Sequence, residues 1–159
     1  KPFVNQLELH LYASGATGWC LTTKQPLRDR RGGVIGLVGI SKDLQTPAAE
    51  ASGMDQIATA IRHLQTHLAE PLTVTDLAQI ARLSAYQLDQ RCRKVFHLTV
   101  GQLMTKLRMD AAALRLRETD DSLGAIAHDC GYADQSAFTR QFRRTTGLTP
   151  AVYRRSQRA

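Results

Sequence analysis

The feature that most constrains the fold is an internal repeat in the second half of the chain. Two stretches align when one is shifted by 49 residues before a presumed turn and by 50 residues after it. The one-residue difference falls in the turn, where an insertion costs least. The chain therefore contains two copies of one helical unit. The residues that match are Leu77 with Ile126, Ala78 with Ala127, Leu88 with Phe138, Cys92 with Phe142, and Arg93-Lys94 with Arg143-Arg144.

The pattern of apolar residues in each copy predicts a short helix, a tight turn and a longer helix. The first unit spans about 74–97 and the second about 122–146. This is helix-turn-helix geometry, in which the second helix enters the major groove of DNA. A plain helical bundle whose repeat reflects packing alone is the alternative, and the repeated basic pair favours DNA. The expected N-caps are Thr75 or Asp76 and Ser84 in the first unit, and Ser122 and Asp134 in the second.

Between the two units, the sequence predicts a linker helix at about 100–118 that is apolar on two sides. A helix with two apolar faces is covered on both, so we expect one unit to pack on each end. Its length of about 30 Å is close to one turn of DNA, about 34 Å, which places two recognition helices in successive major grooves. The first face carries Leu103, Met104, Leu107, Ala111 and Leu114; the second carries Met109, Ala112 and Leu116.

The first 45 residues alternate with period two, which indicates strands. Three stretches show it, around Leu7–Leu11, Trp19–Thr23 and Val34–Ile40, with a hairpin connection at 29–33. Residues 46–53 read as a linker, and 54–159 as the helical domain. The predicted fold class is mainly α: two helix-turn-helix subdomains joined by a long linker helix, preceded by a short antiparallel β segment.

The charge favours an anionic partner. The 159 residues carry 21 Lys and Arg against 14 Asp and Glu, a net charge of +7, with six Arg and no acid after residue 138. Nucleic acid and an acidic membrane surface both fit this balance. No apolar run is long enough to span a membrane, and no membrane partner is expected.

No catalytic, cofactor or metal site is expected, and the chain is predicted not to be an enzyme. Cys20 has no companions for a zinc site, and no Cys-x-x-Cys motif occurs, which fits a reducing cytoplasm. His63 and His67 have a metal-compatible spacing, but no third ligand is placed to join them, so a solvated face is the better interpretation. Single-strand binding is disfavoured because Phe138 and Phe142 are expected to face the core.

The second unit contains the strings Ile126-Ala127, Cys130-Gly131-Tyr132, Phe142-Arg143-Arg144 and Thr149-Pro150. With these, residues 54–157 resemble the DNA-binding domain of the AraC/XylS family of bacterial transcription regulators. The resemblance implies a sequence-specific regulator of double-stranded DNA, an activator in contact with RNA polymerase, located in the cytoplasm with the nucleoid.

Trp19 and the stretch 33–43 resemble the last three strands of a PAS sensor domain, with a generic β-meander as the alternative. The resemblance implies a sensor segment that can form a homodimer. The first half of a PAS domain has no counterpart, and the chain begins at Lys1, so we expect it to be part of a longer protein. The alternative function is a PAS-mediated interaction or dimerisation module with only nonspecific affinity for DNA.

The family resemblance also implies the contacts with DNA. Arg140 suits a guanine edge, and Gln90 or Gln135 suits adenine, whereas Asp89 suits cytosine or repels phosphate. Arg82, Gln90, Cys92 and His97 depart from the family pattern, so we expect the second unit to be the better formed. Base contacts are assigned to Ala85, Tyr86, Asp89, Gln90, Gln135, Ser136, Thr139 and Arg140, and backbone contacts to Ser84, Arg93, Lys94, Arg143, Arg144 and Arg154.

Overall fold

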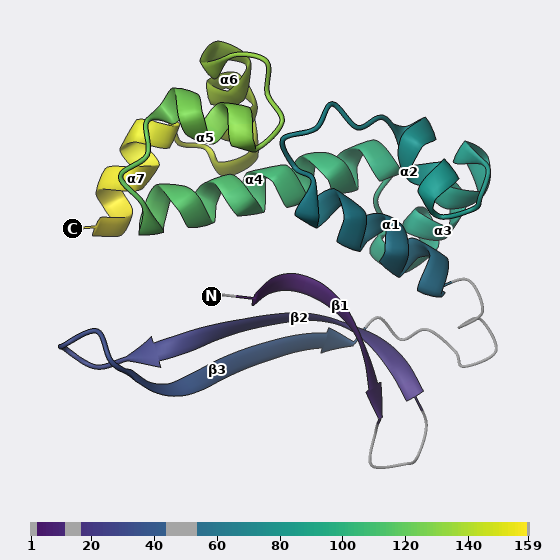
Figure 1. The fold of residues 1–159 in the computed structure, drawn as a ribbon, viewed down its shortest axis with the longest axis horizontal. Coiled ribbons are helices and arrows are strands. Elements are labelled where there is room, and N and C mark those ends of the chain that lie inside the picture. Colours follow the sequence, from purple (N-terminus) through teal and green to yellow (C-terminus); the bar gives the residue numbers. More distant parts are fainter. Residues whose placement is uncertain (1–2, 12–16, 44–53, 159) are drawn as a thin grey trace.

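A computed structural model describes residues 3–11, 17–43 and 54–158. A three-stranded antiparallel sheet comes first in the chain, in the order β1-β2-β3, and helices α1 to α7 follow. The helices form two groups at the two ends of the long helix α4, and the sheet lies along one side of them (Figure 1). The expected linker, 46–53, lies outside the described residues.

The sheet consists of β1 (Phe3–Leu11), β2 (Thr17–Arg28) and β3 (Val34–Asp43). The hairpin between β2 and β3 is closed by a hydrogen bond of 2.8 Å from the Asp29 backbone amide to the Gly33 carbonyl. Asp29 Oδ1 also accepts from the amides of Arg31 and Gly33, each at 2.8 Å, as Asp does in turns.

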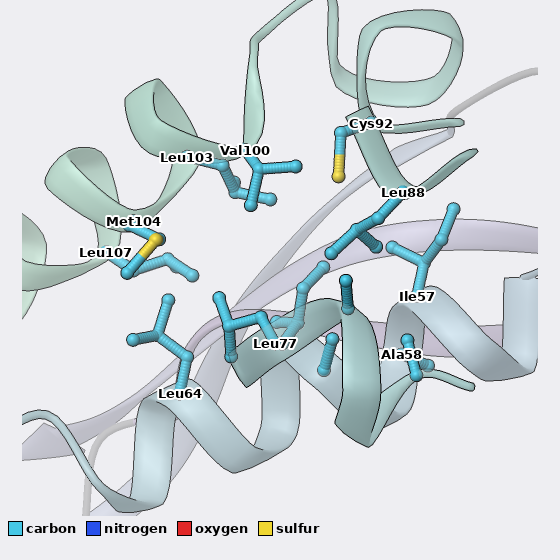
Figure 2. Packing of buried hydrophobic residues seen from close by; sticks show 14 of the residues in the cluster. Ile57, Ala58, Leu64, Leu77, Leu88, Cys92, Val100, Leu103, Met104 and Leu107 are labelled. Carbon is cyan, nitrogen blue, oxygen red and sulfur yellow. The ribbon is translucent and has the colours of Figure 1, made fainter. Parts of the chain in front are cut away.

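The first helical unit comprises α1 (Met54–Thr66), α2 (Val74–Ile80) and α3 (Ala85–Phe96). These three helices bury their apolar stripes against the first half of α4 (Val100–Glu118). Figure 2 shows the side chains of this core pointing toward one another, and its centre is formed by Ile57, Leu64, Leu77, Leu88, Cys92, Val100, Leu103, Met104 and Leu107.

The second unit comprises α5 (Leu123–Asp129), α6 (Gln135–Thr146) and α7 (Pro150–Arg158). It packs on the second half of α4. Its core is a chain of aromatic rings, in which Tyr132, Phe138, Phe142 and Tyr153 follow one another at centroid distances of 5.3 to 5.7 Å. The buried members from α4 are Met109, Ala112 and Leu116.

The two faces of α4 are as the sequence predicts, with two exceptions. Leu103, Met104 and Leu107 belong to the first core, whereas Met109, Ala112 and Leu116 belong to the second. Ala111, expected on the first face, packs against the second core instead. Leu114, also expected on the first face, is half-buried and belongs to neither core. The predicted fold class, two helix-turn-helix units joined by a long helix after an antiparallel β segment, is confirmed.

Short polar residues begin most of these helices. Ser84, Ser122 and Asp134 are the N-caps of α3, α5 and α6, as the sequence predicts. The predicted cap of α2 is wrong: Thr73 is the N-cap, and its hydroxyl and the Asp76 carboxylate form a capping box. Asp76 is therefore the third residue of the helix rather than its cap.

Equivalent turns of the two units use different residues at left-handed backbone positions. The turn between the paired helices has Arg82 at φ 55° in the first unit and Gly131 at φ 77° in the second. The longer helix ends at His97 with φ 57° in the first unit and at Gly147 with φ 79° in the second. Because a left-handed conformation is costly for any residue with a Cβ, the first unit carries strain at both positions.

Replacing the two glycines of the second unit tests this backbone argument. Gly147→Ala should lower the free energy of unfolding by about 1–2 kcal/mol, since a Cβ there meets no atom within 4 Å and only the backbone cost applies. Gly131→Ala should cost about 2–5 kcal/mol, because its Cβ would also lie 2.3 Å from the Leu68 carbonyl oxygen. Urea unfolding measures both, and equal losses would contradict the packing at Gly131.

Candidate nucleic-acid interface

Helix α3 presents one polar face to solvent. Leu88, Cys92 and Val95 fix its orientation by burial in the first core. The opposite face starts at the cap, where Ser84 Oγ accepts from the Gln87 amide at 3.1 Å. The exposed residues of the expected contact set are Ser84, Ala85, Tyr86, Gln90, Arg93 and Lys94, with Tyr86 73% exposed.

Helix α6 repeats the arrangement with a more basic surface. Phe138 and Phe142 are fully buried and hold the helix on the second core. The exposed expected contacts are Gln135, Ser136, Arg140, Arg143 and Arg144, and Thr139 is half-buried beside them. On each helix, side chains that can bond base edges lie in the first half and cations follow in the second half, where they also suit the helix dipole.

Asp89, expected to contact a base, accepts hydrogen bonds within the protein. Its Oδ2 accepts from Arg93 Nε at 2.7 Å, and its Oδ1 accepts from the backbone amide of Val100 at 3.0 Å. These two hydrogen bonds, first from Arg93 and then from Val100, lower the pKa of the Asp89 carboxyl from its ordinary value of 3.8. Both oxygens are thus engaged within the protein, and Asp89 joins α3 to the start of α4.

Arg154, expected to contact the DNA backbone, lies within the second unit. It is half-buried, and its Nη2 donates to the carbonyl oxygen of Asp121 at 2.6 Å. Its Nε is buried and has no hydrogen-bond partner among the described residues. Arg154 therefore attaches α7 to the segment before α5 and is not part of the exposed basic face of α6.

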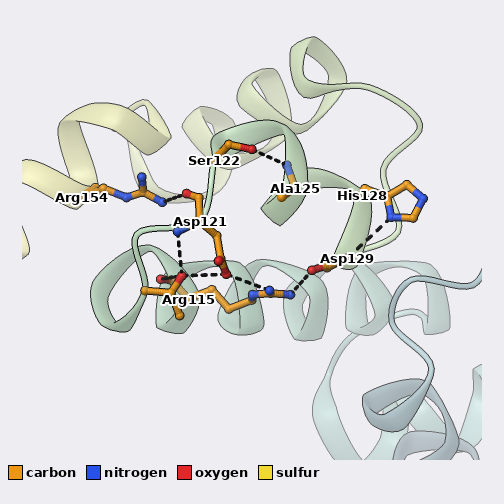
Figure 3. A network of polar contacts seen from close by, with 8 residues as sticks. Arg115, Asp121, Ser122, Ala125, His128, Asp129 and Arg154 are labelled. Carbon is orange, nitrogen blue, oxygen red and sulfur yellow. Dashed lines mark hydrogen bonds and ion pairs between the residues drawn. The ribbon is translucent and has the colours of Figure 1, made fainter.

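An ionic network holds the second unit on α4 (Figure 3). Arg115 lies between two carboxylates, with Nη2 2.9 Å from Asp121 Oδ2 and Nη1 2.5 Å from Asp129 Oδ2. Thr119 Oγ1 donates to Asp121 Oδ2 at 2.9 Å. Since Asp129 ends α5, this network fixes the helix that precedes α6.

A polar groove lies between α6 and the start of α4. It has a volume of about 520 Å³. Its cations are Lys106, which pairs with Asp110 at 2.9 Å, and Arg144. Its lining offers hydroxyl, amide and cationic donors, the groups that bind phosphate oxygens. The full lining is Thr99, Gly101, Gln102, Thr105, Lys106, Gln141, Arg144 and Thr145.

The remaining candidate groups form no reactive centre. Burial raises the pKa of the Cys92 thiol to about 12 and that of Cys130 to about 11, so neither is a thiolate near neutral pH. The rings of His63 and His67 stack with centroids 4.0 Å apart. Among the described residues, no group of three His, Cys, Asp or Glu can hold a metal ion, and no helix is long and apolar enough to cross a membrane.

Two helix-turn-helix units on one shared helix, each with a solvent-facing polar second helix, define a double helix-turn-helix DNA-binding protein. Comparison with known families agrees. Residues 77–156, half of the chain, match the family described as a helix-turn-helix domain, and residues 1–49 match the PAS fold. The chain belongs to the AraC family of DNA-binding transcription regulators.

Individual relatives support the same assignment. The regulatory protein SoxS of Salmonella typhimurium is 36% identical over 98 residues, which cover 62% of this chain and 92% of SoxS. A putative AraC-like transcription regulator of Streptomyces lividans is 39% identical over 103 residues, and the match spans 33% of that longer protein.

Among solved structures, the DNA-binding domain of the global transcriptional factor AdpA, in complex with a target DNA, superposes with a TM-score of 0.62 at 30% identity. The match covers 65% of this chain and 93% of that one. An AraC-type regulator from Chromobacterium violaceum shares the fold at 22% identity, with a TM-score of 0.62 over 67% of this chain and 96% of that one.

Acid should weaken the network around Arg115. Hydrogen bonds from Arg115 and then Thr119 lower the pKa of the Asp121 carboxyl from 3.8 in the folded protein. The ionised carboxylate therefore stabilises the fold at a pH above the unfolded-state pKa, and this stabilisation is lost as the pH falls through the folded-state pKa. Asp121→Asn should lower the unfolding temperature near neutral pH, and the difference from the native chain should vanish below the folded-state pKa. Thermal unfolding across this range, with Asp55→Asn as the control for one lost surface carboxylate, measures it. A difference that persists in acid would refute the ionic role.

Proposed function

We propose that this chain is a sequence-specific transcription activator that reads two successive major grooves of double-stranded DNA with α3 and α6. The observation that carries the proposal is the matched presentation of these helices. Each buries one face in its own core and exposes a face that combines base-bonding side chains with cations. A helix so oriented is the element that enters a major groove.

In the second unit, Arg140 is suited to bond a guanine edge through two donors, and Gln135 to pair with adenine. Ser136 and Thr139 add shorter hydroxyl groups beside them. Arg143 and Arg144 follow on the same helix and bind the phosphate backbone, which sets the register without reading sequence. The crystallised complex of AdpA with a target DNA, at 30% identity to this chain, supports the assignment.

In the first unit, the readers are Ala85, Tyr86 and Gln90. Ala85 is suited to apolar contact with a thymine methyl group, and the Gln90 amide to an adenine edge. Ser84 and Lys94 bind phosphates, and Arg93 binds them in an orientation set by Asp89. Asp89 does not read a base in this proposal, because both of its oxygens are engaged by Arg93 and Val100.

The activating role rests on the family resemblance, which implies contact with RNA polymerase. In vitro transcription from a promoter that carries the selected site should rise when the native chain is added and should not rise with Arg140→Ala. A fall in transcription with the native chain would show repression instead.

A second candidate function rests on the hairpin of β2 and β3. Six apolar side chains there are 47% to 74% exposed, on both faces of the hairpin, and exposed apolar surface of this kind marks an interaction surface. In this alternative the sheet mediates homodimerisation and the helices hold DNA without sequence preference. The exposed residues are Leu27, Val34, Ile35, Leu37, Val38 and Ile40.

Selection of binding sites from random duplex DNA distinguishes the two functions. The native chain should enrich two blocks about ten base pairs apart, one for each major groove. Arg140→Ala should erase the second-unit block at a cost of about 1–3 kcal/mol, because a bidentate contact with guanine is lost. Arg62→Ala, which removes an exposed cation from α1, should leave both blocks intact. Enrichment of no sequence at all would favour the interaction module.

The phosphate contacts predict a separate signature. Arg143→Ala should weaken binding equally for all sequences and reduce the slope of log affinity against log salt by about 1, since one phosphate contact fewer releases fewer counterions. Titrations at several salt concentrations, with Arg62→Ala as the matched loss of charge, measure the slope. An unchanged slope together with altered base preference would place Arg143 among the base readers.

A further inference from the structure

The two cores lie on opposite faces of α4, and the buried residues of one are distinct from those of the other. A single shared helix leaves the angle between the units sensitive to small rotations and bends. A contact that also ties the units to each other directly would remove this freedom. The turn that follows α1, the side chain of Arg108 and the turn between α5 and α6 form such a contact.

Arg108 connects α4 to the first unit. Its Nη2 donates to the backbone carbonyl oxygen of Glu70 at 3.1 Å. The same oxygen accepts from the Leu72 amide at 2.8 Å across Pro71, and the Glu70 amide donates to the His67 carbonyl oxygen at 3.1 Å. The carbonyl oxygen of Glu70 therefore belongs to a hydrogen-bonded turn. Because the ring of Pro71 fixes the backbone φ angle within this turn, the oxygen has a defined position.

Gly131 brings the second unit to the same place. A Cβ on Gly131 would lie 2.3 Å from the Leu68 carbonyl oxygen and 3.0 Å from both Cζ and Nε of Arg108. The backbone of the second unit's turn thus touches the first unit's turn and the guanidinium together. Arg108 Nε is buried here without a hydrogen-bond partner among the described residues. The Nε edge of the guanidinium is therefore held by packing against the turn at Gly131.

We propose that Arg108 is a positioning residue, and that its junction with Leu68, Glu70 and Gly131 fixes the separation and angle of α3 and α6. This inference rests on the proposed reading of two major grooves. The junction is linked to both reading helices. On one side, Asp134, three residues after Gly131, caps α6. On the other, the turn at Leu68–Glu70 leads into α2, which shares the first core with α3. It makes the protein selective for the spacing between the two base blocks.

The first test compares spacing selectivity. The native chain should bind the selected two-block site about tenfold or more tightly than sites with one base pair inserted between the blocks or removed. Arg108→Gln should reduce this ratio several-fold and leave the base preference within each block unchanged. Arg62→Gln, the same exchange at an exposed position on α1, should keep the native ratio. A uniform loss of affinity with the native ratio retained would overturn the proposal.

The second test needs no DNA. Residual dipolar couplings of the native chain should fit one alignment tensor for both units, whereas Arg108→Gln should require two. Arg108→Lys keeps the charge but loses the planar guanidinium, so it should also require two tensors. This variant provides the test if Arg108→Gln does not fold. One tensor in a folded variant would refute the junction. If the native chain selects a single block, the two-groove function fails, and these couplings still decide whether Arg108 fixes the units.

Discussion

Burial of two opposite faces of α4 is the interaction on which the rest of the structure depends. Val100, Leu103 and Leu107 complete the first core, and Ala112 and Leu116, both 0% exposed, complete the second. Neither short pair of helices, α2 with α3 or α5 with α6, can bury its apolar surface alone, so each pair needs its half of α4. The positions of α3 and α6 on the shared helix are therefore a consequence of how α4 distributes its apolar residues.

The two units share one design but differ in how they achieve it. The second unit uses glycine where the backbone turns left-handed and an aromatic chain in its core, whereas the first uses Arg82 and His97 at those turns and the small Cys92 where the second has Phe142. Both units still orient their longer helix by a capping side chain and a buried stripe. The fold thus tolerates strain in one copy because packing, rather than turn preference, determines the helix positions.

The fold class was predictable from the sequence because it depends on periodicity: the repeat, the two-faced linker helix and the caps at Ser84, Ser122 and Asp134 are local patterns. The cap at Thr73 was also readable, since Thr73 and Asp76 have the capping-box spacing. Three other contacts were not, namely those of Asp89 with Val100, Arg154 with Asp121 and Arg108 with Glu70, because the partners lie 11, 33 and 38 residues apart. An exposed cation and a cation that holds the fold together look alike in a sequence.

The separate cores on α4 have a consequence for local unfolding. Each unit, with its own core, is a candidate cooperative unit that opens with its own free energy, and the strained turns of the first unit lower its opening cost. Backbone amides in the middle of α4, where the halves adjoin, become accessible to exchange only when both units have opened. Hydrogen exchange would thus be slowest in the connecting helix, so the element between the domains is also the last part of the fold to come apart.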